Sequence, residues 1–215
     1  MRAGQAGRSA ATDAKERIVT AAERLIAERG AQVPLRDIAV AAEQRNNSAV
    51  QYHFGSRNGL IEAVVAFRHV PVQARQITLL AEHEDTAADD DVATLLRIFV
   101  RPMLEVPYRQ GATHYARFLE QVRTHPAVSE ESARRGDRGA ATRIIVSRLR
   151  RAMHGLPDDV RLRRIRSLPT VLFALLSDHE RAAEAGAARI DDPRAADELI
   201  SVLAGMLTAP QAIPR

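Results

Sequence analysis

A polar segment in the first third of the chain carries residue types that can read DNA. The stretch from Arg45 to His53 contains Arg, Asn, Ser, Gln, Tyr and His side chains. Asn and Gln can pair with the N6 and N7 atoms of adenine, and Arg, Ser and Tyr suit phosphates or base edges. A solvated helix surface more often carries Glu and Lys, and this stretch has neither. We therefore predict that double-stranded DNA is contacted by Arg45, Asn46, Asn47, Ser48, Gln51, Tyr52 and His53.

Catalysis and metal binding find little support in the sequence. There is no Cys, which excludes structural disulfides, thiolate zinc sites and Cys nucleophiles. No His-Glu-x-x-His motif, phosphate-binding Gly loop or Gly-x-Ser-x-Gly motif occurs. The cluster Asp178-His179-Glu180 falls on an expected helix, where consecutive side chains point in different directions and cannot share one metal ion. We expect no catalytic site, no metal site and no cofactor, and therefore no enzyme.

Short amphipathic helices are expected to hold the polar segment in place. Asp13 and Glu16 have the spacing of a capping box, and Gly30 suits a helix C-cap, so a first helix is predicted between them. Pro34 suits the first turn of a second helix. Residues 1–12 are small and polar, and we expect a disordered arm there. The apolar residues of the first helix recur at helical spacing: Ile18, Ala21, Ala22, Leu25 and Ile26.

A tight polar turn separates the second helix from a third. Residues 43–47 include no apolar residue, and Ser48 or Asn47 can cap a helix that ends at Phe54. The second and third helices are expected to pack through five apolar residues: Leu35, Ile38, Ala39, Val50 and Phe54. This arrangement matches the helix-turn-helix plan, in which the third helix reads the DNA.

The remainder of the chain is predicted to be helical. Ser56 suits the cap of a fourth helix from about Arg57 to Arg68, and Pro71 should kink or end that helix. Further helical segments are expected at 72–83, 91–106, 112–123, 129–154, 157–186 and 194–208. No alternating β-like pattern stands out. We predict an all-α fold with a helix-turn-helix DNA-binding domain at 13–57 and a larger helical domain for effector binding and dimerisation at 58–215.

In three pieces the sequence resembles the TetR family of bacterial transcriptional regulators. The matching text is IVTAAERLIAERG at Ile18–Gly30, LRDIAVAA at Leu35–Ala42 and YHFGSRNGL at Tyr52–Leu60. The three pieces occur in order with nearly the family spacing and cover about residues 14–66. The resemblance implies a ligand-responsive transcriptional regulator, a repressor that binds DNA as a homodimer.

The resemblance assigns roles to individual positions and departs at some of them. Arg57 stands where the family has Lys, and phosphate contacts are implied for Tyr52, His53 and Arg57. Glu43 replaces a family Gly at the end of the second helix, and Gln51 replaces a family Tyr. Asn58-Gly59 replaces a common Glu, and Gly59 in a first helical turn costs up to about 1 kcal/mol of helix propensity. The alternatives are that His53 only packs the helix end and that Arg57 is only a surface charge.

The last two expected helices carry more apolar surface than one monomeric face needs. Two such helices can pair with their copies as a four-helix bundle, which would form a homodimer. The alternative is that they bury these residues against their own chain. We predict a dimer interface made of Leu168, Leu172, Leu175, Leu199, Val202, Leu203 and Met206.

A small-molecule effector site is implied by the resemblance alone, among residues 72–175. An apolar or aromatic effector would suit the apolar side chains there, Phe99, Met103, Phe118 and Phe173, and His114 is a polar candidate beside them. The same composition describes ordinary core, so a regulator without a ligand remains the alternative. The expected function is a repressor that a small molecule releases from its operator. A helical interaction module that keeps the shape without binding DNA is another alternative, which charge reversal in the third helix would favour.

Charge and hydropathy agree with a DNA-binding protein that lies outside membranes. The chain has a formal net charge of +4, and residues 1–70 hold ten basic and seven acidic residues. Most of the positive excess therefore lies in the first third, as expected for a part that meets a polyanion. No apolar run approaches the roughly 20 residues that span a bilayer, and the N-terminus lacks a signal-peptide pattern. We expect a bacterial cytoplasmic protein, located at the nucleoid when it is bound to DNA.

Overall fold

Nine helices form the regular structure within the residues that the structure describes. The computed structural model describes residues 3–44, 46, 48–86, 89–105, 114–126, 128, 139–190 and 192–211, with side chains from residue 12 onward. No strand occurs in this part of the chain, and the all-α prediction is confirmed. The helices are α1 (Ala3–Arg29), α2 (Leu35–Ala41), α3 (Ala49–Phe54), α4 (Arg57–Asp85), α5 (Val92–Glu105), α6 (Tyr115–Gln121), α8 (Ala140–Ala152), α9 (Asp158–Glu184) and α10 (Pro193–Thr208).

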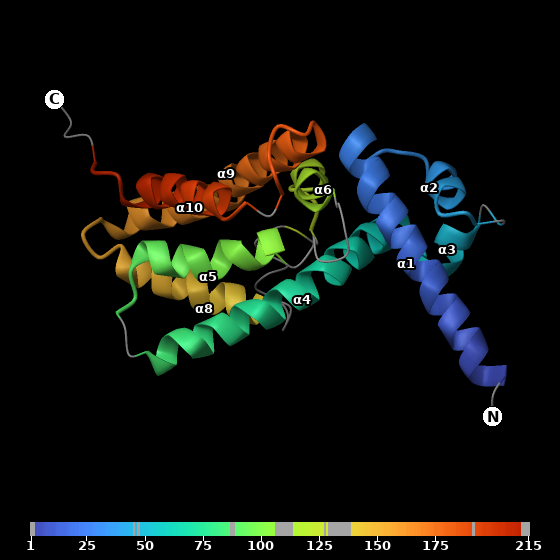
Figure 1. Ribbon diagram of the computed structural model, residues 1–215, viewed down its shortest axis with the longest axis horizontal. Coiled ribbons are helices and arrows are strands. Elements are labelled where there is room, and N and C mark those ends of the chain that lie inside the picture. Colours follow the sequence, from blue (N-terminus) through green and yellow to red (C-terminus); the bar gives the residue numbers. More distant parts are fainter. Residues whose placement is uncertain are drawn as a thin grey trace.

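The helices form two parts that α4 connects. α1, α2 and α3 gather at one end with the beginning of α4, and α5, α8, α9 and α10 pack together at the other (Figure 1). α4 runs diagonally from the first part into the second, while α6 contacts both α1 and α9. The part formed by α1, α2 and α3 and the larger part are therefore linked by a continuous helix and by a short helix at their boundary.

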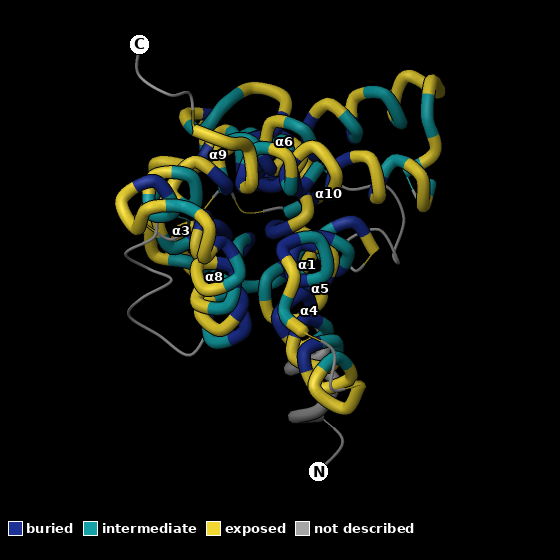
Figure 2. Tube along the Cα trace, turned by 90° about the vertical axis from the view of Figure 1, so that its left-hand side faces the viewer, coloured by how far each residue is buried: buried dark blue, intermediate teal, exposed yellow. Residues whose placement is uncertain are grey.

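Each part has its own apolar core. The first core contains Ile18, Ile38 and Val50, and the second contains Leu95 and Leu149, all with 0% exposure. Buried residues line the inner sides of the helices and exposed residues face outward (Figure 2). The α6 side chains that belong to the first core, not the second, are Tyr115, Phe118 and Leu119. Most of α6 therefore packs into the first core, although it lies far along the sequence, whereas its Ala116 belongs to the second.

α1 begins earlier than the capping pattern predicts. It starts at Ala3, so Asp13 and Glu16 lie inside the helix and do not cap it, and the helix continues through residues 3–12 where a disordered arm was expected. Extending an existing helix costs much less than nucleating one, and the alanines of this segment favour the extension. The predicted C-cap is confirmed, because Gly30 has φ +87° and its N–H donates to the Ile26 carbonyl at 2.8 Å.

α4 continues through Pro71 to Asp85, so of the two outcomes predicted at Pro71, a kink or an end, the helix does not end there. Two buried glutamines beyond the proline fasten the helix to its neighbours. Gln73 Nε2 donates to Thr142 Oγ1 at 2.7 Å, and Gln76 Nε2 donates to the Phe99 carbonyl at 2.8 Å. These contacts with α5 and α8 offset the missing proline N–H, which sequence propensity alone does not anticipate.

The remaining helices fall close to the predicted segments. α5, α6, α9 and α10 lie within or one residue beyond the expected ranges, and α8 occupies the later part of 129–154. Residues 129–138 of that segment are outside the described residues. None of the described helices has a stretch long and apolar enough to cross a membrane.

Candidate nucleic-acid interface

α3 is held in place by apolar contacts along one side. Ile38 and Ala39 of α2 and Val50 of α3 are completely buried, and Phe54 packs against the same core. α2, α3 and α4 contact one another in sequence order. This confirms the predicted packing of the second and third helices, and it leaves the opposite side of α3 for solvent.

The exposed side of α3 carries the polar residues predicted to meet DNA. Ser48, Gln51 and Tyr52 are exposed, and the exposed fraction of Tyr52 reaches 84%. His53 is half-buried between two rings, with centroid distances of 5.0 Å to Tyr52 and 6.1 Å to Phe54. The Tyr52 phenol is thus presented outward from a helix whose other side is fixed in the core.

The turn before α3 is organised by Asn46. Its Oδ1 accepts from the Ser48 N–H at 2.8 Å, and its carbonyl accepts from the Ala49 N–H at 2.9 Å. The Ser48 side chain makes no capping hydrogen bond, so it does not cap α3 as predicted, and the alternative cap Asn47 is not described. The Ser48 hydroxyl remains available to a ligand. Arg45 and Asn47, also predicted to contact DNA, lie outside the described residues.

Gln51 has one half of its amide engaged within the protein. Its Nε2 donates to the Gly55 carbonyl at the end of α3, while Oε1 is exposed with the rest of the side chain. A two-bond contact with adenine needs both the donor and the acceptor of the amide. In this conformation Gln51 can accept one hydrogen bond from a base, and a paired contact requires it to release Gly55.

Arg57 anchors the corner between α1 and α2. Its Nη1 donates to the carbonyls of Ala31 and Val33 at 2.9 and 2.6 Å. The residue was predicted to bind a phosphate, or alternatively to be a plain surface charge, and neither reading anticipated this connection. The bonds tie the start of α4 to the turn before α2, so they fix the frame that holds α3.

Gly59 is required by a close backbone contact at the start of α4. The Ser56 cap is confirmed, because its Oγ accepts from the Gly59 N–H at 3.0 Å. A Cβ on Gly59 would lie 2.2 Å from the Phe54 carbonyl oxygen, a separation that real Cβ atoms do not show. Gly59, which was expected to destabilise the helix, therefore allows the close backbone approach between the end of α3 and the start of α4.

Glu43 adopts the backbone conformation for which the family pattern uses glycine. Its φ is +55°, and it alone among the described residues other than glycine has a positive φ. Left-handed backbone costs an L-residue with a side chain about 1–2 kcal/mol, whereas glycine adopts it without steric cost. The turn after α2 thus takes a left-handed backbone at a residue that carries a side chain.

Replacing Glu43 by glycine is expected to stabilise the protein by about 0.5–1 kcal/mol, since relief of the left-handed strain exceeds the added entropy of the unfolded chain. The midpoint of urea unfolding should rise accordingly. Glu43→Ala is the matched control, because it removes the charge and keeps the strain, and it should give no such gain. An equal gain in both variants would contradict the assignment of the strain to φ.

A buried ion pair joins the two parts of the molecule. Arg68 Nε lies 2.7 Å from Glu23 Oε2, and their side chains are only 9% and 2% exposed. The other oxygen of Glu23 accepts from the backbone N–H of His114 at 3.0 Å. Burial lowers the pKa of His114, with Arg117 adding to the shift, and burial raises the pKa of Tyr115 with a further contribution from Glu23. α1, α4 and the start of α6 therefore meet at one carboxylate.

The N-terminus of α6 is capped from the other side by α9. The Glu180 oxygens accept from the N–H groups of Ala116 and Arg117, both at 3.0 Å, and Glu180 is 3% exposed. The Arg117 side chain also pairs with Glu184 at 2.7 Å. A carboxylate at this position satisfies N–H groups that a helix cannot pair internally. The sequence suggested only a local charge cluster at Glu180, because its partners lie more than sixty positions away.

The residues predicted to bind an effector lie in different surroundings. Phe118 is completely buried in the first core, and Phe99, Met103 and Phe173 are partly buried, the last two between both cores. His114 is half-buried beside Glu28 and Glu184. A surface groove between α4 and α8 and another over α5, α9 and α10 are both lined by other residues. The described residues also contain no group of three or more His, Asp or Glu side chains placed to hold a metal ion.

The residues predicted at a dimer interface divide into two groups. Four lie in the second core of the single chain with exposures of 8% or less: Leu168, Leu172, Leu199 and Leu203. The chain itself therefore covers most of their surface, which is the alternative weighed above. Val202 is 45% exposed, and Leu175 and Met206 are partly exposed. Leu175, Leu199 and Val202 line the groove over α5, α9 and α10.

Comparisons with known proteins agree with these features. The family model described as "Tetracyclin repressor-like, C-terminal domain" matches residues 97–206, slightly more than half of the chain. A TetR family transcription regulator from Marinobacter aquaeolei VT8 has the same fold, with a TM-score of 0.58 and 15% identity over 93% of this chain and 97% of that one. A protein from Rhodococcus sp., assigned to the TetR family of transcriptional regulators, is 18% identical over 91% of this chain and 99% of that one, with a TM-score of 0.48. No curated protein matches the chain. The family model over the larger part and the helix-turn-helix at the other end together show that this chain belongs to the TetR family of transcriptional regulators, which are DNA-binding proteins and not enzymes.

Proposed function

We propose that the protein is a cytoplasmic repressor that binds operator DNA as a homodimer and is released by a small molecule. The observation that carries the proposal is the division of α3 into two sides. Val50 is completely buried, whereas Tyr52 is the most exposed of the large apolar and aromatic side chains in the described residues. A helix of six residues has little stability of its own, so an exposed aromatic and amide surface on it is best explained by a ligand.

The proposed contacts follow from the side chains on that surface. Tyr52 and His53 bind phosphates, while Ser48 and the free oxygen of Gln51 meet base edges in the major groove. Arg57 supports this surface through the carbonyls of Ala31 and Val33, and only its remaining N–H groups are left for a phosphate. Phosphate contacts set the position of the helix, and base contacts supply the sequence preference.

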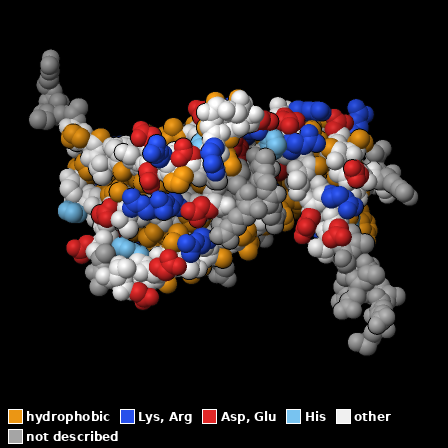
Figure 3. Space-filling model, viewed as in Figure 1, with side chains coloured by type: hydrophobic (Ala, Val, Ile, Leu, Met, Phe, Trp, Pro, Cys, Tyr) orange, Lys and Arg blue, Asp and Glu red, His pale blue; other side chains and the backbone are white. Residues whose placement is uncertain are grey.

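The proposed dimer uses the outer surface of α9 and α10. The candidates that stay accessible there are Leu175, Val202 and Met206. In Figure 3 apolar side chains are exposed between charged ones on the face formed by α5, α8 and α10. Pairing of the two copies would place two α3 helices on successive half-sites about 34 Å apart, or at a multiple of that distance.

Control by an effector would act through the boundary between the two parts. α6 is capped by Glu180 of α9 and touches Glu23 of α1 through His114. A ligand that shifts α4 or α6 would change the spacing of the two α3 helices. The coupling between effector and DNA must be reciprocal, so operator DNA would weaken effector binding by the same factor.

Replacing Tyr52 by alanine is expected to weaken operator binding by about tenfold or more, the loss typical of one well-placed contact. Fluorescence anisotropy with duplexes from the DNA that flanks the coding region of the protein measures this change. The wild-type affinity should fall steeply as salt rises, because phosphate contacts release counterions. Titration to saturation should give two chains for each palindromic site.

Val70→Ala is the control, since it truncates an exposed apolar residue of α4 outside the proposed interface. It should leave DNA affinity unchanged. Weak binding that ignores sequence and is equal in wild type and Tyr52→Ala would show instead a helix-turn-helix kept only for its fold.

A further inference from the structure

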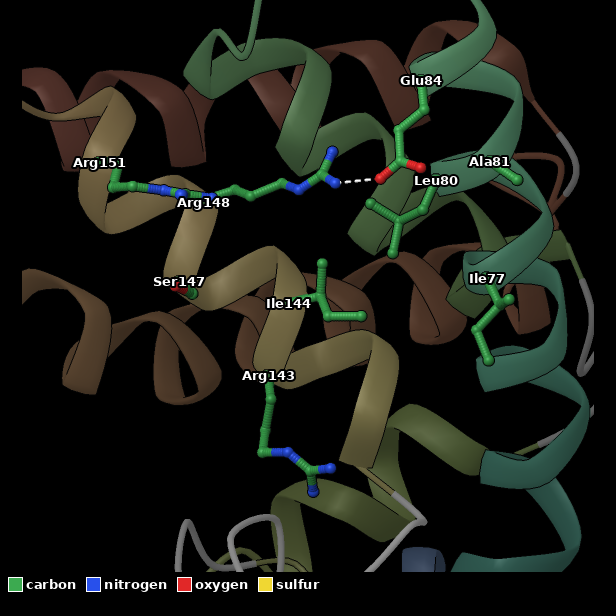
Figure 4. A pocket seen from close by; sticks show the side chains of 9 residues that line it. All are labelled: Ile77, Leu80, Ala81, Glu84, Arg143, Ile144, Ser147, Arg148 and Arg151. Atoms are coloured by element: carbon green, nitrogen blue, oxygen red, sulfur yellow. Dashed lines mark hydrogen bonds and ion pairs between the residues drawn. The ribbon is translucent and has the colours of Figure 1, made fainter.

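A groove with two unlike walls lies between α4 and α8. Its volume is about 540 Å³, which falls in the range of small-molecule sites. The α4 wall is mainly apolar and consists of Ile77, Leu80 and Ala81, with Glu84 at one end. Figure 4 shows these side chains on one side of the groove and those of α8 on the other.

The α8 wall combines one apolar side chain with several cations. Ile144 stands opposite the apolar residues of α4, and the exposed fractions of Ile144 and Ile77 are 44% and 51%. Arg143, Arg148 and Arg151 lie along the same wall. Large aliphatic side chains rarely gather on a surface without a partner, so the groove has the features of a site that is covered in use.

One cation of this wall, Arg151, has no acidic partner among the described residues. α8 contains four arginines and no acidic residue. Arg148 reaches across the groove to Glu84 and lies 3.6 Å from Asp90, whereas Arg151 has no ion-pair partner among the described residues. An occupant that matches both walls must therefore carry an aliphatic or aromatic body and a negative head.

We propose that this groove binds an anionic amphiphile, with its apolar body against Ile77, Leu80 and Ile144 and its carboxylate or related head at Arg148 and Arg151. The role of this ligand as the effector of the repressor rests on the proposed function. The head competes with Glu84 for Arg148, because both are anions within reach of the same guanidinium. An uncharged molecule of the same length fills the apolar wall, but Arg148 stays with Glu84 and Arg151 gains no partner.

The position of the groove explains how such a ligand reaches the DNA-binding part. Its apolar wall belongs to α4, the helix that begins at Arg57 beside α3. The same helix carries Arg68, which holds Glu23 of α1. A ligand that separates α4 from α8 thus acts on the element that frames the recognition helix.

Isothermal titration calorimetry of the free protein tests the groove with decanoate and with 1-decanol, both below their aggregation limits. Decanoate should bind once per chain and about tenfold more tightly than 1-decanol, the effect of a charge-assisted hydrogen bond. Arg151→Gln should remove most of that difference, and Glu84→Gln should increase decanoate affinity because it frees Arg148. Arg163→Gln, which neutralises an exposed arginine of α9, is the matched control and should change neither affinity.

Equal affinity for decanoate and 1-decanol, a difference that survives Arg151→Gln, or no decanoate binding would each overturn the groove proposal. Fluorescence anisotropy with operator DNA distinguishes a failure of the groove proposal from a failure of the proposed function. Decanoate binding with the expected variant pattern establishes the groove even if no DNA binds. Operator binding that decanoate leaves unchanged would remove the effector role and leave the proposed repressor intact.

Discussion

Replacing Arg68 by methionine is expected to lower the free energy of unfolding by about 3–5 kcal/mol, because it leaves the Glu23 carboxylate buried without its cation. The two side chains are 9% and 2% exposed, so water cannot replace the lost partner. The pair also joins α1 to α4, and the change should therefore weaken DNA binding as well as folding. Urea unfolding followed by circular dichroism measures the stability.

Glu23→Gln/Arg68→Met tests whether the cost arises from the uncompensated charge. The amide keeps an oxygen for the His114 N–H, and the double variant should recover a large part of the lost stability. Arg163→Gln breaks an exposed pair whose side chains are 64% and 66% exposed, and it should cost about 0.5 kcal/mol or less. A double variant no more stable than Arg68→Met would show that lost packing, and not the charge, sets the cost.

Replacing Gly59 by alanine is expected to destabilise the protein by about 1–3 kcal/mol, the usual cost of forcing extra volume into a closely packed place. The added Cβ would lie 2.2 Å from the Phe54 carbonyl oxygen, and a backbone atom cannot rotate away as a side chain can. Helix propensity alone predicts the opposite sign, since alanine is favoured over glycine by about 1 kcal/mol. The sign of the change in the urea midpoint therefore distinguishes the two readings.

DNA affinity supplies a second measurement for Gly59→Ala. Relief of the contact must move the end of α3 away from the start of α4, so operator binding should weaken under conditions in which the variant is fully folded. Gly155→Ala is the control, because its Cβ would meet no atom within 4 Å, and it should leave both stability and DNA affinity nearly unchanged. A Gly59→Ala variant more stable than wild type would refute the close contact.

Local signals in the sequence predicted the buried sides of α1, α2 and α3 and two of the helix boundaries. The spacing of Ile18, Leu25, Ile38 and Val50 predicts which side of each helix is buried, because neighbouring turns of one helix share a face. Gly30 and Ser56 mark a helix end and a helix start through bonds to residues at most four positions away. Periodicity and caps involve only nearby residues, so these elements could be placed without tertiary information.

The same reasoning gave incorrect predictions where contacts between distant residues determine the local structure. α4 passes through Pro71 because Gln73 and Gln76 are bonded to α5 and α8. Arg57 was expected to face solvent or DNA, but it binds the carbonyls of Ala31 and Val33. Each outcome depends on partners that lie more than twenty positions away. The spacing of residues along the chain cannot predict such partners.

The amino-acid sequence alone determined the all-α class, the helix-turn-helix and the polar surface of α3, since helical periodicity and turn chemistry are local. Contacts between distant residues determine that Leu172 and Leu203 are core residues, that Glu23 pairs with Arg68, and that Glu180 caps α6. An apolar helix face has the same pattern whether its own chain or a second copy covers it. A glutamate likewise looks the same in the sequence whether its carboxylate is solvated or buried. Only folding brings its partner within hydrogen-bonding distance.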